Sequence, residues 1–268
     1  MVKLIDIHAH VNFRDFDYDR EEIIEKTLAN GIWFINVGDD FKSSKESVEL
    51  ANKYDGVFAS VGVHPHCIDE GFDTNEYKKL ALGENVVAIG ECGLDYYKIQ
   101  NAKIKNQNDN SKFKIKEKQK ELFEKQIELA LEVNKPLMIH CREAHDDVIE
   151  ILNSEFIIQN SKLRGNVHFF TGKQKHVEKY LELGFTVSFT GVITFTNSYD
   201  EVIKNLPLEK MMVETDSPLV APVPYRGKRN EPMYVKEVVK KIAKIKDLSY
   251  EEVAEQTTKN AIDFFGLK

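Results

Sequence analysis

The chain has 268 residues, of which 42% are hydrophobic and 30% charged, and this composition excludes a disordered, collagen-like or coiled-coil protein. The formal net charge of −7 excludes the uniformly basic surface of a protein that coats nucleic acid. The longest uncharged stretch, from Leu183 onward, carries serine and threonine throughout, and the N-terminus has no apolar leader. We therefore expect no membrane span and a cytoplasmic location, and the three cysteines lack the spacing of a disulfide framework.

Short apolar runs rich in β-branched residues recur along the chain and predict eight strands. They cover residues 3–7, 32–37, 57–63, 86–89, 136–139, 166–169, 185–189 and 211–213. Stretches of helical period lie between them, among others at 21–29, 116–133 and 144–152. A closing helix at 251–264 begins at a capping box of Ser249 and Glu252 and ends before Gly266. The alternation predicts a single α/β domain over 1–268, a (β/α)8 TIM barrel, with a doubly wound open sheet as the alternative.

A lysine-rich segment is the one shift in composition along the chain. Residues 98–120 hold eight lysines and only two acidic residues. The interval from Glu91 to His140 is 49 residues, whereas His64 to Glu91 is 27 and His140 to His168 is 28. Roughly 20 extra residues therefore form an insertion, at about 98–118, after the fourth strand. We expect an exposed solvated loop there, and an electrostatic funnel for a polyanion is the less favoured interpretation.

Polar side chains gather where the predicted strands end. They are His8 and His10 on the first strand, His64 and His66 after the third, Glu91 on the fourth, His140 on the fifth, His168 on the sixth and Asp216 after the eighth. In a barrel of this type the C-terminal strand ends meet at one mouth, which carries the active site. Four imidazoles and two carboxylates exceed the ligands of one tetrahedral ion and suit two divalent ions with a bridging carboxylate. A buried polar network without metal is the weaker alternative, because several imidazoles would lack partners.

Seven segments match, in order, the signature segments of a known family. They are residues 6–10 (DIHAH), 62–66 (GVHPH), 90–96 (GECGLDY), 140–144 (HCREA), 168–172 (HFFTG), 214–218 (ETDSP) and 226–232 (RGKRNEP). Through them the chain resembles the TatD family of metal-dependent deoxyribonucleases, in the amidohydrolase superfamily, over nearly its whole length. The resemblance implies a distorted TIM barrel. Three positions depart from the commonest family pattern without removing a ligand: Ala9, Glu143 and Phe169.

The resemblance also implies a role for each site residue. His8, His10 and Asp216 would hold one ion, Glu91 would bridge, and His140 with His168 would hold the second. His64 would contact the scissile phosphate.

The ligand set predicts catalysis by a water held between the two ions, with Asp216 accepting its proton. Arg142 is expected to add a donor to the phosphate, and Arg226, Lys228 and Arg229 to follow the flanking backbone. For Arg142, an ion pair with Glu143 or Asp95 is nearly as well supported.

Several other polar residues receive a structural interpretation. Cys92 and Cys141 each follow a predicted ligand by one position, so they are expected to turn toward the helix layer as small core residues. His145 and His176 fall in helical segments and are expected to be solvated. Glu214, and with the same caution Asp95, is expected to orient a ligand imidazole rather than to bind metal.

Three functions compete at this stage. The favoured one is a two-metal phosphodiesterase that acts on DNA as an exonuclease, with single-stranded DNA or 3'/5' ends as its substrate. The alternative is hydrolysis of a carbonyl ester or amide, such as removal of a D-amino acid from tRNA, and a non-catalytic binding protein is the least supported. Zn, Mn and Mg all remain candidates for the ions, and no obligate protein partner is inferred.

Overall fold

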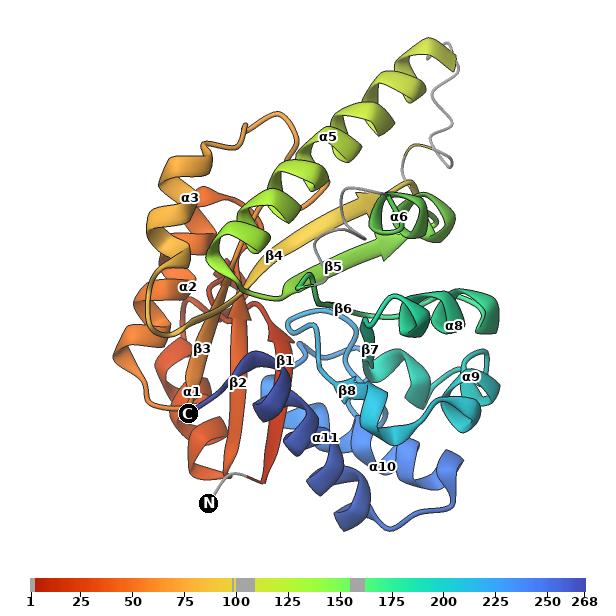
Figure 1. Cartoon of the computed structure of the whole chain (residues 1–268). Helices are drawn as coiled ribbons and strands as arrows, with labels where there is room; N and C mark the ends of the chain where they lie inside the picture. The colour runs from red at the N-terminus through yellow and green to blue at the C-terminus, as the bar shows by residue number, and fades with distance from the viewer. Residues whose placement is uncertain (1–2, 98, 100–108, 155–161) are drawn as a thin grey trace.

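The computed structural model describes residues 3–97, 99, 109–154 and 162–268. Eight parallel strands form one sheet in the order β1-β2-β3-β4-β5-β6-β7-β8. The ring closes where the backbone N–H of His10 donates to Ser217 O at 2.7 Å, and that of Asp216 donates to His8 O at 2.9 Å. Helices alternate with the strands and cover the outside of this ring (Figure 1). The predicted barrel is confirmed.

The strands have the following bounds: β1 Leu4–Ala9, β2 Ile32–Val37, β3 Val57–Val61, β4 Val86–Asp95, β5 Leu137–Arg142, β6 Gly165–Val167, β7 Thr186–Phe189 and β8 Met211–Val213. The helices are α1 Arg20–Ala29, α2 Phe41–Lys53, α3 Thr74–Ala81, α5 Asp109–Val133, α6 His145–Leu152, α8 Gln174–Glu182, α9 Asp200–Asn205, α10 Val235–Lys246 and α11 Tyr250–Phe265. Short 3-10 turns lie at Arg14–Phe16, Gly191–Thr194, Leu208–Lys210 and Pro232–Tyr234. No helix among the described residues is long and apolar enough to cross a membrane.

Strand β4 is longer than its sequence predicts. It continues through Gly90 and Gly93 to Asp95, whereas glycine in a strand normally indicates a break. Here glycine is needed for the close approach of β5, because a Cβ on Gly93 would lie 2.1 Å from His140 O. The extension carries Glu91 and Asp95 side by side with His140 across the β4–β5 pairing.

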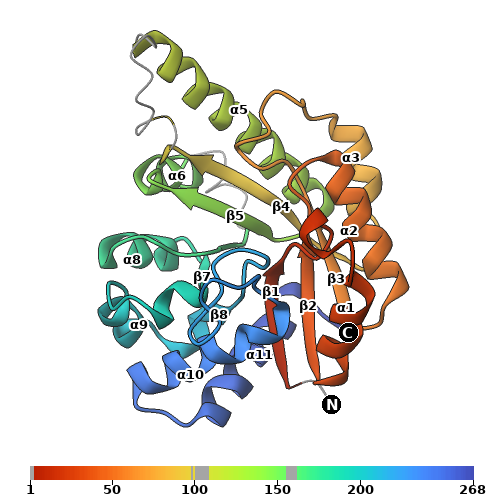
Figure 2. The same ribbon diagram turned by 180° about the vertical axis from the view of Figure 1, so that it is seen from behind.

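Helix α5 also departs from expectation. It begins at Asp109, so the lysine-rich residues 109–118 are helical and the predicted loop is wrong for them. Lysine, glutamate and glutamine are good helix formers, and a charge run does not oppose a helix whose next turns pack on a sheet. Residues 98 and 100–108 of the predicted insertion lie outside the described residues. Figures 1 and 2 both show the first turns of α5 projecting beyond the barrel.

The last helix, α11, begins and ends where its capping signals predict. Ser249 accepts from the backbone of Glu252 and completes a capping box, and Gly266 ends α11 with φ +68. Asn260 donates at 2.8 Å to Leu208 O and to Met211 O, and so ties α11 to the start of β8. Helix α11 therefore closes the fold through hydrogen bonds as well as apolar packing.

The core has two parts, and one of them supports the strand-end residues. The larger cluster fills the layer between sheet and helices, and it includes Cys92 and Cys141, as predicted for small core residues. The smaller cluster contains Met138 and Met212. Residues two apart on a strand share a face, so Met138 lies on the face that carries His140. Strand-end polar groups therefore rest on a rigid apolar layer.

Candidate metal centre

Glu91 is the centre of the strand-end cluster and is 4% exposed. Its Oε1 lies 2.7 Å from His140 Nδ1 and 2.8 Å from His168 Nε2. Its Oε2 lies 3.4 Å from His8 Nε2 and 3.5 Å from His10 Nε2. Each carboxylate oxygen thus faces its own pair of imidazoles.

The first pair comes from β1 and the residue beyond it. His8 Nε2 and His10 Nε2 are 3.0 Å apart, and Asp216 Oδ1 lies 3.8 Å from the former and 3.5 Å from the latter. Ligands on one tetrahedral Zn²⁺ at the usual bond lengths are separated by about 3.3 Å. The four side chains of this group therefore fit one divalent ion.

The proton positions support this interpretation. His10 Nδ1 lies 3.0 Å from Val37 O, and a carbonyl accepts only, so the ring proton is assigned to Nδ1. The lone pair on Nε2 then points at the lone pairs of Glu91 and Asp216. Two carboxylate oxygens and one imidazole lone pair therefore converge on one point, as the ligands of a cation do.

The second pair is oriented in the same way by carboxylates. His140 Nδ1 and His168 Nε2 are 3.4 Å apart beside Glu91 Oε1. The other nitrogen of His140 lies 3.2 Å from Asp95 Oδ2, and that of His168 lies 3.6 Å from Glu214 Oε1. Each ring thus turns one nitrogen toward Glu91 and the other toward a second carboxylate, and the positions of Asp95 and Glu214 agree with the orienting role expected of them.

Charge is redistributed strongly around Glu91. Burial raises the pKa of its carboxyl, but His64 and His168, with hydrogen bonds from His140 and His168, hold that pKa well below its usual range. Burial lowers the pKa of His64 well below its usual range. The centre therefore combines an ionised carboxylate with a neutral imidazole at its edge.

The ring of His64 turns a nitrogen of a different kind toward Glu91 than the ring of His10 does. The backbone N–H of His66 donates to His64 Nδ1 at 3.0 Å, so the ring proton is assigned to Nε2. That N–H lies 3.4 Å from Glu91 Oε1. Distance alone groups His64 with Glu91 and His140 as a possible ligand, but a protonated nitrogen cannot ligate. His64 is a donor facing the centre.

His66 and Asp95 form a contact that sequence reasoning missed. His66 Nε2 lies 3.0 Å from Asp95 Oδ2, the oxygen that also meets His140. The HPH spacing of residues 64–66 placed His66 at a strand end, but no role followed from it. Its partner became visible only because β4 runs on to Asp95.

Known proteins are similar to this chain in sequence over nearly its whole length. The profile of the family described as TatD related DNase matches residues 5–266. The chain belongs to this family. The resemblance inferred from the motifs is thereby confirmed.

Relatives of this TatD-family chain include YabD of Bacillus subtilis, an uncharacterized metal-dependent hydrolase, which is 39% identical over 98% of each chain. The 3'-5' ssDNA/RNA exonuclease TatD of Citrobacter rodentium is 30% identical over 98% of each. Among solved structures, the TatD homolog YJJV of Escherichia coli has a TM-score of 0.84 at 24% identity, covering 99% of each chain, which supports the fold. The protein is a metal-dependent hydrolase of the TatD family.

The metal centre of this TatD-family hydrolase opens into a pocket of about 710 Å³. Five of the six predicted ligands line it, whereas His8 is fully buried beneath. Arg142 also lines it, with its guanidinium 3.7 Å from the ring centre of Tyr97. Arg142 is therefore placed where it can meet a substrate in the pocket.

The other predicted substrate-binding cations lie further out. Arg226 stacks 3.9 Å from the ring centre of Phe195 and donates to Ala221 O. Arg229 is held by Asp19 through two hydrogen bonds of 2.8 and 2.7 Å. Lys228 is exposed. Contacts within the protein thus hold both Arg226 and Arg229, and in the described part of the chain only Arg229 is neutralised by a carboxylate.

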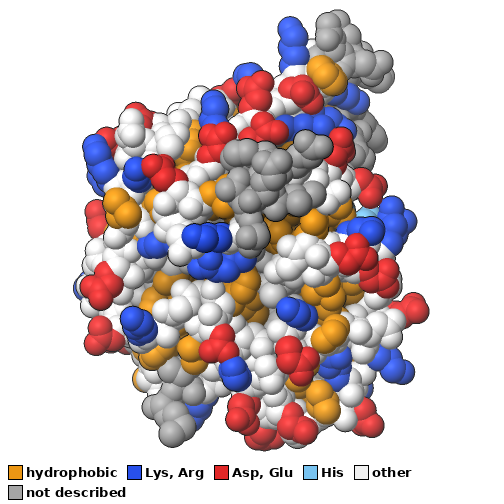
Figure 3. Space-filling model, in the orientation of Figure 1, with side chains coloured by type: hydrophobic (Ala, Val, Ile, Leu, Met, Phe, Trp, Pro, Cys, Tyr) orange, Lys and Arg blue, Asp and Glu red, His pale blue; other side chains and the backbone are white. Residues whose placement is uncertain are grey.

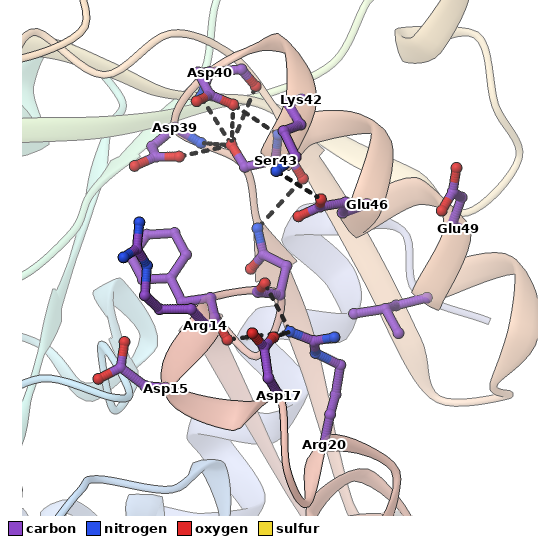
Figure 4. Close-up of a pocket in the computed structure, with 13 residues that line it drawn as sticks. Arg14, Asp15, Asp17, Arg20, Asp39, Asp40, Lys42, Ser43, Glu46 and Glu49 are labelled. Carbon is purple, nitrogen blue, oxygen red and sulfur yellow. Dashed lines mark hydrogen bonds and ion pairs between the residues drawn. The ribbon is translucent and has the colours of Figure 1, made fainter.

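A second pocket, of about 610 Å³, adjoins the first and shares Phe13 and Asp39 with it. Figure 4 shows its lining side chains, which carry six carboxylates and three cations. The carboxylates are Asp15, Asp17, Asp39, Asp40, Glu46 and Glu49, and the cations are Arg14, Arg20 and Lys42. The excess of carboxylates makes this side of the mouth unfavourable for a chain of phosphates.

One expectation about the remaining histidines is wrong. His145, predicted to be solvated, is buried, with Nδ1 3.0 Å from Tyr180 OH and 3.2 Å from Cys141 Sγ. It stands at the first turn of α6, which packs there on α8, so its ring is covered from both sides. His176 is half-buried.

Proposed function

We propose that this hydrolase cleaves phosphodiester bonds of DNA, as an exonuclease on single-stranded ends, with two divalent ions at Glu91. The observation that carries the proposal is the position of the Glu91 carboxylate, whose two oxygens each face a separate pair of imidazole nitrogens. The nitrogen-rich donor set favours Zn²⁺ or Mn²⁺ over Mg²⁺. Ions bound there supply a water acidic enough to attack phosphorus and offset the charge of the phosphate oxygens.

The chain's own groups then divide the work. Asp216 Oδ1 lies beside the His8 and His10 nitrogens and is the carboxylate placed to accept the proton of the attacking water. The Nε2–H of His64 is the donor for a non-bridging phosphate oxygen, because its ring is neutral and its other nitrogen is occupied. Arg142 adds a charged donor at the pocket wall.

A relative's activity favours a nucleic acid over a carbonyl substrate. The Citrobacter rodentium protein, 30% identical over 98% of each chain, is named a 3'-5' ssDNA/RNA exonuclease. A phosphodiester carries a negative charge that the ions at Glu91 can offset and a non-bridging oxygen that the N–H of His64 can reach, so this arrangement also suits a phosphodiester.

The test is cleavage of an end-labelled single-stranded oligonucleotide by chelator-stripped protein, before and after addition of Mg²⁺, Mn²⁺ or Zn²⁺. Glu91→Gln removes the bridging charge with little change of shape, and Glu255→Gln on the exposed face of α11 is the matched control. We expect metal-restored shortening from one end in the wild type and the control, and none in Glu91→Gln. If the metals rebind while DNA stays whole and an aminoacyl ester of tRNA is hydrolysed, the carbonyl alternative replaces this proposal.

A further inference from the structure

The first turns of α5 carry a concentration of positive charge that the proposed chemistry does not use. Residues 112–120, here called the basic arm, hold five lysines and a single acidic residue, Glu117. The chain as a whole has a net charge of −7, so this sign is opposite to that of its surroundings. Figure 3 shows blue side chains along the projecting end of the molecule, with a hydrophobic one among them and acidic ones alongside.

The arm begins at the rim of the pocket. Lys116 Nζ lies 3.9 Å from the ring centre of Tyr96, and the residue before it, Asp95, meets His140 at the metal centre. Tyr97, the residue after it, lines the pocket with Arg142. Lys116 thus lies between the pocket wall and the turns of α5 that project beyond the barrel (Figure 1).

Much of the charge on the arm is not neutralised by the protein. Lys118 pairs with Asp69 at 3.3 Å and Lys120 with Asp147 at 3.0 Å. Among the residues that the structure describes, no carboxylate lies within ion-pair distance of Lys112, Lys114 or Lys116. The positive charges of these three lysines are therefore not neutralised by an ion pair with a described residue, although Lys116 lies over the ring of Tyr96.

Spacing and composition make the arm suitable for a strand. Lys112, Lys116 and Lys120 are four residues apart, so they form a row along one side of the helix with a rise of about 6 Å per step. Phe113, between two lysines, is 60% exposed. Proteins that bind single strands without sequence preference combine a positive track with exposed aromatic side chains on which bases stack.

The part of the mouth that follows β1 and β2 is unfavourable for the strand. The second pocket presents six carboxylates against three cations, which repels a phosphate chain. Toward α5, by contrast, Arg142 at the pocket wall and Lys116 over Tyr96 present positive charge. We infer that the basic arm binds the body of a single-stranded nucleic acid whose end occupies the metal centre. This inference rests on the proposed function, because it takes the substrate from it.

The experiment compares two triple variants of the full chain. Lys112→Gln/Lys114→Gln/Lys116→Gln removes the free cations of the arm, and Lys236→Gln/Lys240→Gln/Lys244→Gln makes the same charge change on α10, at the other end of the molecule from α5 (Figures 1 and 2). Fluorescence anisotropy in the presence of chelator measures the binding of an oligothymidine of about twenty nucleotides across a salt series. Binding is thereby read without cleavage.

The arm variant is expected to reduce the slope of log K against log salt by about 0.7 per lost phosphate contact, or about 2 in total. At about 0.15 M salt this corresponds to a loss of affinity of up to roughly 50-fold, whereas the α10 variant retains the wild-type affinity. Hydrolysis of a dinucleotide, which ends before the arm, is expected to match that of the control. The single substitution Lys114→Gln, at an exposed side chain, is expected to lower the slope by about 0.7. It tests the inference if the triple variant does not fold.

Equal DNA affinity and slope in the arm and α10 variants overturn the inference while leaving the nuclease proposal intact. A loss of binding to phosphatidylserine vesicles in the arm variant, with DNA affinity unchanged, assigns the arm to a membrane surface instead. If the wild type cleaves no DNA but binds it, and the arm variant loses this binding, the proposed function is overturned while the inference about the basic arm stands.

Discussion

Asp95→Asn tests how the His140 side of the centre is held. Asp95 is 1% exposed, and its Oδ2 meets His140 Nε2 at 3.2 Å and His66 Nε2 at 3.0 Å, while Oδ1 accepts from Tyr97 N at 2.8 Å. In the variant the amide oxygen keeps the Tyr97 contact, so the NH2 group faces both imidazoles. A donor then meets the N–H of His140.

The expected response is a change of tautomer at His140. The ring escapes the donor–donor contact by moving its proton to Nδ1, the nitrogen that faces Glu91. Loss of a ligand's outer partner typically lowers metal affinity by about 10–100-fold. Because two charge-assisted hydrogen bonds are lost, we also expect the free energy of unfolding to fall by about 2–4 kcal/mol.

Metal affinity is measured by competition with a chromophoric chelator, and unfolding by urea titration of the stripped protein. Asp263→Asn, at an exposed position on α11, is the control for removing one carboxylate. The activity of Asp95→Asn is expected to recover in part with excess metal, since no atom that touches substrate is removed. Wild-type metal affinity in Asp95→Asn refutes the assignment of the His140 proton to Nε2.

Three further changes have separate readouts. His64→Ala is expected to keep full metal stoichiometry and to lower kcat by about 10²–10³-fold, as for the loss of one transition-state donor, measured beside metal analysis. Burial lowers the pKa of His145 to about 3, so the unfolded chain gains a proton below about pH 6.5 that the folded chain does not take up. Urea titrations should show the free energy of unfolding falling by roughly 2 kcal/mol between pH 6.5 and 5 because of this group. In His145→Phe this contribution to the pH dependence should be absent. Gly93→Ala, whose Cβ would lie 2.1 Å from His140 O, should destabilise by at least about 3 kcal/mol, against about 1–2 for Gly184→Ala in open space. A thermal unfolding temperature for Gly93→Ala equal to that of Gly184→Ala would contradict the close approach.

The barrel was predictable because its signals are local and repeated. The bounds of β2 and β8 agree with the apolar runs that predict them, and the Ser249 capping box starts α11 as expected. The side chains at the strand ends could be grouped without knowing any contact, since parallel strands bring their C-terminal ends to one side.

What escaped prediction depends on contacts between distant segments. Taken from the sequence alone, Gly93 indicates the end of a strand. Only the close approach of His140 O shows why β4 continues through a glycine. The burial of His145 depends on Tyr180, which lies on another helix. The helical start of α5 at Asp109 follows from propensity, which the concentration of lysine charge obscured.

Chemical role in this centre is decided by what the second ring nitrogen meets. His10 and His140 each give a proton to an oxygen, of Val37 in one case and Asp95 in the other, and so offer a lone pair to a cation. His64 receives a proton from the backbone of His66 and so offers an N–H. Since the acceptor or donor at the far nitrogen comes from the fold, we propose that identical side chains at equivalent strand ends serve as metal ligands in two cases and as a phosphate donor in the third.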